Sequence, residues 1–288
     1  MAEARAAGVP TVRRVVLGKR LQDLRERAGL SIEQAAAALD VNQATIRRME
    51  KAEVGLKPVY VEKLLRTYGV DDADTVEGFV TLAREANEPG WWHRYRDVLP
   101  TWFGTFVSLE GEAAVIRGYE PQYVPGLLQT ADYARAILRA GLPHASAAEI
   151  DQLVDLRLER QGLLSRADGP ALWMVIDEAV LRRRVALASV MRAQVDRLIE
   201  AAGLANVTLQ VLPFAAGAHA AMYGPFQIFR FNLPELPDLV YSESLTGAIY
   251  LDERSDVSAY LEALDRICAM AVPAPDVAAI LARLRKEI

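Results

Sequence analysis

Apolar residues recur at helical spacing through the first third of the chain, between residues 15 and 87. Leu17, Leu21 and Leu24 illustrate this spacing, which is typical of helices that bury one face. Gly29 follows them, and glycine suits the left-handed position that ends many helices. The expected helices are 16–28, 32–39, 43–51, 58–68 and 72–87. The pattern therefore predicts an N-terminal all-α domain of five helices.

The second and third of these helices are joined by a short turn at residues 40–42. Ser31 is a suitable N-cap for the second helix, and Gln34, three residues later, completes a capping box. Asn42 can cap the third helix in the same way. Two short helices joined by a three-residue turn, the first rich in alanine and the second polar and cationic, are typical of a helix-turn-helix.

The third helix separates inward-facing from outward-facing side chains. Ile46 and Met49 are three residues apart and should face the core, so the polar side chains project outwards. Glutamine can pair with adenine and arginine with guanine, each pair contributing roughly 1–3 kcal/mol of discrimination, while helix N-termini can bind phosphates. We therefore predict a surface that binds double-stranded DNA, the recognition surface, made of Asn42, Gln43, Ala44, Thr45, Arg47, Arg48 and Lys51. The alternative is a helical packing domain with a solvated cationic face.

Beyond residue 90 the pattern changes, and alternating stretches appear between helical ones. Residues 207–211 and 226–231 alternate with period two, as strands with one wetter face do. Strands are expected at 114–119, 171–176, 207–212, 226–231, 239–243 and near 249–251, and helices at 102–112, 130–140, 147–166, 189–202, 257–271 and 275–286. Strict βαβ alternation is missing, so we predict a larger α+β domain with a mostly antiparallel sheet. The expected domains are 1–88 and 89–288.

The segment from Leu30 to Glu50 resembles the helix-turn-helix of the XRE (phage-repressor-like) family, and the likeness covers roughly residues 15–70. In that family an arginine near the end of the first helix often pairs with a glutamate that ends the recognition helix. The matching residues here are Arg25 and Glu50, so the resemblance implies a structural role for this pair. Asp40 stands where the family usually has a left-handed glycine, a conformation that aspartate tolerates better than most residues.

Several stretches of the second half resemble the C-terminal domain of actinomycete XRE regulators of the WhiJ-like type, which is described as antitoxin-like. These stretches are 119–130, 176–183, 211–214 and 224–226. In that group the regulator is often encoded beside a small acidic or toxin-like protein that it is thought to bind. The resemblance therefore implies a partner protein, but it supplies neither a settled ligand nor an active site.

The charge balance looks unfavourable for a DNA-binding protein until the chain is divided. Lys and Arg number 33 against 38 Asp and Glu, a net charge of −5. The first 70 residues hold 13 basic and 8 acidic side chains, whereas the remaining 218 hold 20 and 30. The basic end is the end with the helix-turn-helix. An acidic body limits non-specific binding to phosphate, so we expect a modest salt dependence.

Patterns of catalytic or metal-ligating residues are weak. The three histidines are far apart without metal-ligand spacing, and Cys268 is the single cysteine, so a disulfide or cysteine zinc site cannot form within the chain. Phosphate-binding glycine loops and nucleophile elbows are missing. Asp177 and Glu178 could do acid–base work, but one of them is expected to cap the following helix. We predict no metal, no cofactor and no enzyme activity, with an enzyme fused to a DNA-binding domain as the alternative.

A second candidate site lies in the C-terminal half. His219 falls in an uncharged loop of small residues between two expected strands, where it could line a ligand or partner site or be a buried, hydrogen-bonded structural histidine. The candidate residues are His219, Tyr223 and Trp92, the last in a tryptophan-rich junction that could instead anchor the two domains. Arginines 182–184 could hold an anionic partner or form a solvated face.

We expect a sequence-specific transcriptional regulator that acts as a homodimer, because one short recognition helix reads few bases. Two half-sites about 34 Å apart would suit such a dimer. The C-terminal domain would mediate dimerisation and the response to a small-molecule ligand or a partner protein. The alternative is an antitoxin-like module that neutralises a small protein encoded by a neighbouring gene, with DNA binding as autoregulation.

The expected location is the cytoplasm. No stretch of signal-peptide type is apparent, and a single cysteine suits a reducing interior. Residues 201–229 contain no charged side chain, but glycines and prolines interrupt them, so we predict buried sheet and a turn in place of a membrane span.

Overall fold

The computed structural model describes residues 12–88, 90–100, 102–232 and 236–288. The chain divides into two compact units. The first comprises the described parts of Met1–Arg94, Thr101–Leu109 and Leu233–Leu236, and the second comprises Tyr95–Pro100, Glu110–Asn232 and Pro237–Ile288. The single domain boundary expected after residue 88 stays a prediction.

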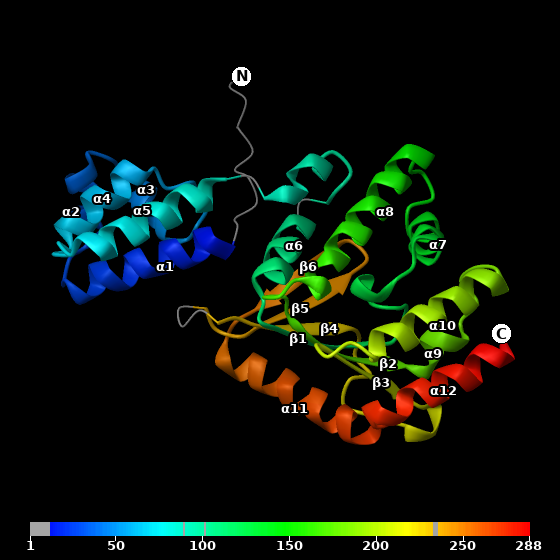
Figure 1. Cartoon of the computed structure of the whole chain (residues 1–288). Coiled ribbons are helices and arrows are strands. Elements are labelled where there is room, and N and C mark those ends of the chain that lie inside the picture. Colours follow the sequence, from blue (N-terminus) through cyan, green and yellow to red (C-terminus); the bar gives the residue numbers. More distant parts are fainter. Residues whose placement is uncertain (1–11, 89, 101, 233–235) are drawn as a thin grey trace. The chain divides into compact units, whose positions relative to one another are not determined.

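Residues 12–88 of the first unit form five α-helices, coloured blue to cyan in Figure 1. They are α1 (Val12–Arg27), α2 (Ile32–Leu39), α3 (Gln43–Glu50), α4 (Pro58–Thr67) and α5 (Ala73–Asn87). The helical N-terminal region is as predicted, except that α1 begins at Val12 and not at residue 16. Val12 and Val16 are both buried one turn apart, so the apolar face of α1 extends further back than the leucine pattern indicates.

The core of the first unit lies between the helices. Leu17 and Leu21 of α1 pack in one buried cluster with Leu56, Leu64 and Leu65. Alanines of α2 belong to the same cluster, and their small side chains allow neighbouring helices to approach closely.

The second unit is built on one six-stranded sheet in the order β3-β2-β1-β4-β5-β6. The strands are β1 (Val115–Glu120), β2 (Ala171–Asp177), β3 (Val207–Leu212), β4 (Phe226–Arg230), β5 (Leu239–Ser244) and β6 (Gly247–Leu251). Strands β1, β2 and β3 pair in parallel, whereas β1–β4, β4–β5 and β5–β6 pair antiparallel. The predicted α+β class with a mostly antiparallel sheet is confirmed, although one half of the sheet is parallel.

Helices cover both faces of this sheet. The crossover from β1 to β2 contains α7 (Ala131–Gly141) and α8 (Ala147–Gln161), and the crossover from β2 to β3 contains α9 (Glu178–Arg182) and α10 (Ala188–Ala202). After β6 come α11 (Arg254–Met270) and α12 (Ala274–Glu287). Figure 1 shows α7 and α8 on the opposite side of the sheet from α11 and α12. β2 is apolar from Leu172 to Ile176, as expected for a strand covered on both faces.

One more α-helix and several short 3-10 turns complete the described part of the chain. Helix α6 (Phe103–Glu112) precedes β1, and a 3-10 turn at Trp91–Tyr95 precedes α6. The uncharged segment 201–229 forms the end of α10, β3, a 3-10 turn at Phe214–Ala216 and β4, as predicted. Among the described residues, no single helix is long and apolar enough to cross a membrane. The pair α11 and α12, bent by 64°, meets the length and composition criteria only when taken together.

Candidate DNA-binding surface

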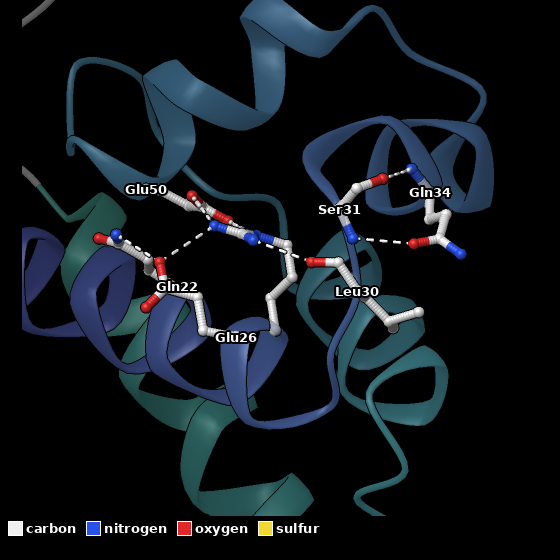
Figure 2. A network of polar contacts seen from close by, with 7 residues as sticks. Gln22, Glu26, Leu30, Ser31, Gln34 and Glu50 are labelled. Atoms are coloured by element: carbon white, nitrogen blue, oxygen red, sulfur yellow. Dashed lines mark hydrogen bonds and ion pairs between the residues drawn. The ribbon is translucent and has the colours of Figure 1, made fainter.

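The start of α2 is held by the predicted capping box, shown in Figure 2. The Gln34 N–H donates to Ser31 Oγ over 3.2 Å, and the Ser31 N–H donates to Gln34 Oε1 over 2.8 Å. The other end of α2 closes on Asp40, which has the left-handed conformation expected from the resemblance (φ 56°, ψ 48°). These two ends determine where the chain leaves α2 and enters the turn.

Asn42 caps α3 as predicted. Its Oδ1 accepts from the Thr45 N–H over 2.8 Å and from Thr45 Oγ1 over 2.9 Å. Both bonds use the same oxygen, so the Asn42 amide nitrogen and the lone pairs of Thr45 Oγ1 remain available to a ligand such as a phosphate. The cap therefore fixes the start of α3 without using all of its polar groups.

The two faces of α3 differ as the spacing predicts. Ile46 and Met49 are 1% and 4% exposed and belong to the core of the first unit. The exposed residues are Asn42, Gln43, Ala44, Arg47, Arg48 and Lys51, while Thr45 is half-buried. Six of the seven residues of the recognition surface are thus exposed at and around α3.

The two arginines on this face differ in their neighbours. Arg47 makes no ion pair with any residue that the structure describes. Arg48 Nε lies 3.8 Å from Glu53 Oε2, and both side chains are 54% exposed. An exposed contact of this length contributes little, so Arg48 can exchange it for another acceptor.

Beneath this face, the structure places Arg25 against Glu50, the pair implied by the resemblance. Arg25 Nε donates to Glu50 Oε1 over 2.7 Å and Arg25 Nη2 donates to Glu50 Oε2 over 3.0 Å. A third nitrogen, Nη1, donates to the Leu30 carbonyl over 2.9 Å (Figure 2). The hydrogen bonds to Glu50 raise the pKa of Arg25 above its ordinary value. One guanidinium thus joins the end of α1, the start of α2 and the end of α3.

Tyr68 lies beside this pair and has an unusual environment. Its hydroxyl is buried and has no hydrogen-bond partner among the described residues. Burial raises the Tyr68 pKa, and the charge of Glu50 raises it further. A buried hydroxyl without a partner is destabilising, so the ring of Tyr68 contributes to packing while its oxygen does not.

Gly18 is a structural residue of this site that the sequence reasoning missed. A Cβ atom there would lie 2.6 Å from the Glu50 carbonyl oxygen and 2.8 Å from that of Met49. Glycine therefore lets α1 approach the backbone at the end of α3. A glycine inside a predicted helix was the available signal, because it weakens a helix unless close packing requires it.

The C-terminal candidate residues fall in different surroundings. His219 is half-buried, and its Nδ1 accepts from the Ala221 N–H over 3.3 Å. Its Nε2 therefore carries the proton and donates to Tyr119 Oη over 3.4 Å, while Tyr119 Oη donates to Asp177 Oδ2 over 3.1 Å. Burial raises the Tyr119 pKa, followed by the charge of Asp177.

Tyr223 and Trp92 do not join this hydrogen-bonded group. Tyr223 is in the same loop as His219, but its side chain is fully exposed. Trp92 is half-buried and belongs to the first unit, whereas His219 and Tyr223 belong to the second. Asp177 also caps α9 by accepting from the Ala179 N–H over 2.8 Å, which is the capping role predicted for one of the two neighbouring carboxylates.

Comparison with known families adds two findings. Residues 16–77 match the model of a helix-turn-helix domain, and residues 103–283 match a domain of unknown function, DUF5753. Comparison with curated proteins and with solved structures gave no significant match. The first match covers α1 from Val16 onwards, all of α2 to α4 and the first turn of α5. It includes the whole recognition surface, and a helix-turn-helix is a DNA-binding fold. The chain carries this helix-turn-helix ahead of the larger domain, and it belongs to the DUF5753 family.

Proposed function

We propose that the protein is a sequence-specific transcriptional regulator that binds double-stranded DNA through α3, as an XRE-type regulator does. The observation that carries this proposal is the exposed polar face of α3 within a helix-turn-helix. Gln43, Arg47 and Arg48 stand on it, and none of them is committed to a strong contact within the described protein. These residue types read adenine and guanine in the major groove.

The support for base reading also comes from rigidity. A side chain reads a base only if its helix is held in one position, and α3 is held by its Asn42 cap, by two buried apolar residues and by Arg25. Arg25 and Glu50 are bonded to each other and shielded from solvent, so we assign them a positioning role. Asn42 and Lys51, at the two ends of α3, are assigned to backbone phosphates.

The experiment that tests base reading uses an operator selected from random DNA with the full chain. Loss of one bidentate arginine–guanine pair corresponds to roughly a 5- to 150-fold loss of affinity. Arg48→Ala is expected to abolish the footprint on this operator while leaving the thermal unfolding midpoint unchanged. Arg84→Ala, an exposed arginine on α5 of the same unit, is the control for loss of one charge. A footprint retained by Arg48→Ala contradicts the assignment.

The proposal includes a homodimer. An eight-residue recognition helix reads few base pairs, so two copies on half-sites about 34 Å apart are needed for a specific operator. The larger domain would supply the dimer contacts. Sedimentation at micromolar concentration is expected to give twice the chain mass of 31.7 kDa, and the footprint is expected to be two-fold symmetric. A monomer with a single half-site contradicts this part of the proposal.

A second candidate function is antitoxin-like binding of a small acidic protein, with DNA binding as autoregulation, as in WhiJ-like regulators. The observation that favours it is a set of exposed apolar and basic residues in the segments that follow β2 and β3, two strands that pair in parallel. Phe214, Met222 and Tyr223 are 57%, 67% and 102% exposed there. Arg183 and Arg184 are exposed and make no ion pair among the described residues. Such residues complement acidic residues set around apolar ones.

The neighbouring gene's product distinguishes the two functions. If the second is right, this product copurifies with the chain and arrests growth when expressed alone. Tyr223→Ser together with Phe214→Ser is then expected to release it while operator binding stays unchanged. A neighbour that neither copurifies nor arrests growth contradicts the second function and leaves the first.

We further propose that the protein has no enzymatic activity and acts in the cytoplasm, where the DNA is. The Tyr119–Asp177–His219 group contains no strong nucleophile, and Asp177 is committed to a helix cap. Turnover of any metabolite by the full chain, lost in His219→Ala, contradicts the first statement.

A further inference from the structure

We propose that the second unit binds the anionic group of a small molecule, a carboxylate or a phosphate, through Arg157 and Tyr123 near the carboxyl end of β1. This inference deepens the ligand response within the proposed function and rests on it for its regulatory meaning. The binding itself needs no DNA, so it can fail or succeed separately from operator recognition. We call the group formed by Glu120, Tyr123, Arg157 and Glu243 the Arg157 cluster.

The cluster occupies a particular place in the sheet. Glu120 is the last residue of β1, Tyr123 lies in the loop after it, and Glu243 is close to the end of β5. At β1 the sheet changes from parallel pairing with β2 to antiparallel pairing with β4. In open sheets with helices on both faces, ligands bind beyond the carboxyl ends of the strands. The binding place lies between two neighbouring strands whose connections leave toward opposite directions along the sheet.

Arg157 is a half-buried cation without a carboxylate partner. Its Nη1 donates to Gln129 Oε1 over 2.6 Å, and its other nitrogens make no hydrogen bond or ion pair with the described residues. Burial lowers the Arg157 pKa to about 10, and the charge of Arg160 lowers it as well, yet the side chain stays charged at neutral pH. A charge taken out of water normally has a partner of opposite charge.

The neighbouring arginine, Arg160, differs from Arg157 because a carboxylate accepts from two of its nitrogens. Arg160 Nε and Nη2 each donate to Glu110 over 2.7 Å, and both side chains are almost fully buried. The Glu110 carboxylate is therefore committed to Arg160. Two arginines one helical turn apart on α8 thus differ, one with a bidentate partner and one with open donors.

The nearby carboxyl groups form no ion pair with Arg157, although the charge of Glu243 raises its pKa slightly against the effect of burial. Burial raises the pKa of Glu120 to about 8, so at pH 7 it is mostly uncharged, and its Oε1 accepts from the Gln122 N–H over 3.1 Å. Glu243 is exposed and accepts from the Tyr241 hydroxyl over 2.9 Å. Neither carboxyl is within ion-pair distance of Arg157 in the described structure.

Tyr123 adds a second open donor to the cluster. It is half-buried, and its hydroxyl makes no hydrogen bond with any described residue. Burial raises its pKa, so the hydroxyl keeps its proton, while the nearby charge of Arg157 acts in the opposite direction. The neighbouring Tyr133 differs, because its hydroxyl accepts from the Val124 N–H over 3.2 Å.

The donors define the class of ligand. A guanidinium presents two nitrogens side by side, which matches the two oxygens of a carboxylate or phosphate, and a phenol hydroxyl can donate to one of them. Glu243 and a partly ionised Glu120 disfavour a ligand of high negative charge. The site therefore suits a single anionic group, and a ligand that also carries an ammonium or hydroxyl donor would use these carboxyls.

The test measures binding to the full chain without DNA. Sodium acetate and sodium phosphate are titrated against sodium chloride of equal ionic strength, with the unfolding midpoint and tyrosine fluorescence as readouts. A saturable response to acetate or phosphate but not to chloride is expected, and the stronger of the two identifies the ligand group. Arg157→Gln is expected to lower the affinity at least tenfold and Tyr123→Phe about threefold.

Two matched controls separate binding from folding. Arg139→Gln removes an exposed arginine from α7, and Tyr133→Phe removes a hydroxyl that has a partner. Tyr133→Phe should lower the unfolding midpoint and keep the anion response, whereas Tyr123→Phe should do the reverse. If Arg157→Gln fails to fold, Tyr123→Phe decides the matter. A wild-type chain that responds alike to all three salts, or an equal response in Tyr123→Phe, overturns the proposal.

Discussion

Arg25 in the first unit is buried and Arg157 in the second is half-buried, and the donors of the two side chains are used differently. Arg25 gives two hydrogen bonds to Glu50 and one to the Leu30 carbonyl. Arg157 gives one, to an uncharged amide, and its neighbour Arg160 takes the available carboxylate of Glu110. An arginine whose donors are all used holds elements together, whereas one with open donors is suited to a ligand. The same residue type thus positions the recognition helix in one unit and forms a candidate site in the other.

The strongest way to probe this contrast is to break the fully paired arginine beside the open one. Glu110→Ala takes the carboxylate away from the charged and buried Arg160, and removal of one member of a buried pair costs about 3–5 kcal/mol. Urea unfolding of the full chain measures this loss. Asp196→Ala, which removes the exposed partner of Arg285, is the control and should cost under about 1 kcal/mol. Equal losses of stability in the two variants would mean that burial does not increase the contribution of the Arg160–Glu110 pair.

The second probe removes the arginine beneath the recognition surface. Arg25→Ala is expected to lower the stability of the first unit by about 3 kcal/mol, because Glu50 and the Leu30 carbonyl both lose their donor. Thermal unfolding followed by circular dichroism measures the change, with Arg27→Ala as an exposed control on the same helix. An unchanged midpoint would count against the positioning role of the pair.

The third probe uses pH and the buried carboxyl of the Arg157 cluster. The pKa of Glu120 rises from 4.5 to about 8 on folding, so the folded state holds a proton that the unfolded state releases between these values. Stability therefore falls as pH rises from about 4.5 to 8, by at most about 1.4 kcal/mol per pH unit. Glu120→Gln should remove this slope and make the protein more stable at pH 8 than the wild-type chain. Glu262→Gln, on the surface of α11, should leave the slope unchanged.

The smallest expected effect concerns Tyr68. Its hydroxyl is buried without a partner, so Tyr68→Phe removes an unsatisfied group and should raise stability by up to about 1 kcal/mol. Tyr133→Phe, which removes a hydroxyl that accepts a backbone hydrogen bond, should lower it by a similar amount. Chemical denaturation of the two variants gives the comparison. A loss of stability in Tyr68→Phe would show that its hydroxyl has a role in the first unit.

Local contacts explain why so much of the helix-turn-helix was predictable. The Ser31–Gln34 box and the Asn42 cap join residues three apart, and both formed as expected. Period-two alternation likewise predicted β3 with its observed bounds. Each of these signals depends on spacing within a few residues, where backbone geometry alone decides which groups meet.

Contacts between residues that are distant in the sequence could not be predicted from such local spacing. The Arg160–Glu110 pair joins positions 50 apart, and nothing in the spacing around either residue indicates it. The close approach of Gly18 to the end of α3 likewise joins segments that are distant in the sequence. The order of the strands, with a parallel half beside an antiparallel half, was also missed.

The sequence by itself determined most of the elements of this protein, the face of α3 that points outwards and the division of charge between a basic first part and an acidic remainder. These follow from periodicity and composition, which are properties of neighbouring residues. Only the tertiary structure decided which polar groups have hydrogen-bond or ion-pair partners. Whether Arg25, Arg157 or Tyr68 has a partner depends on side chains brought together by packing, and burial then sets the cost of lacking one.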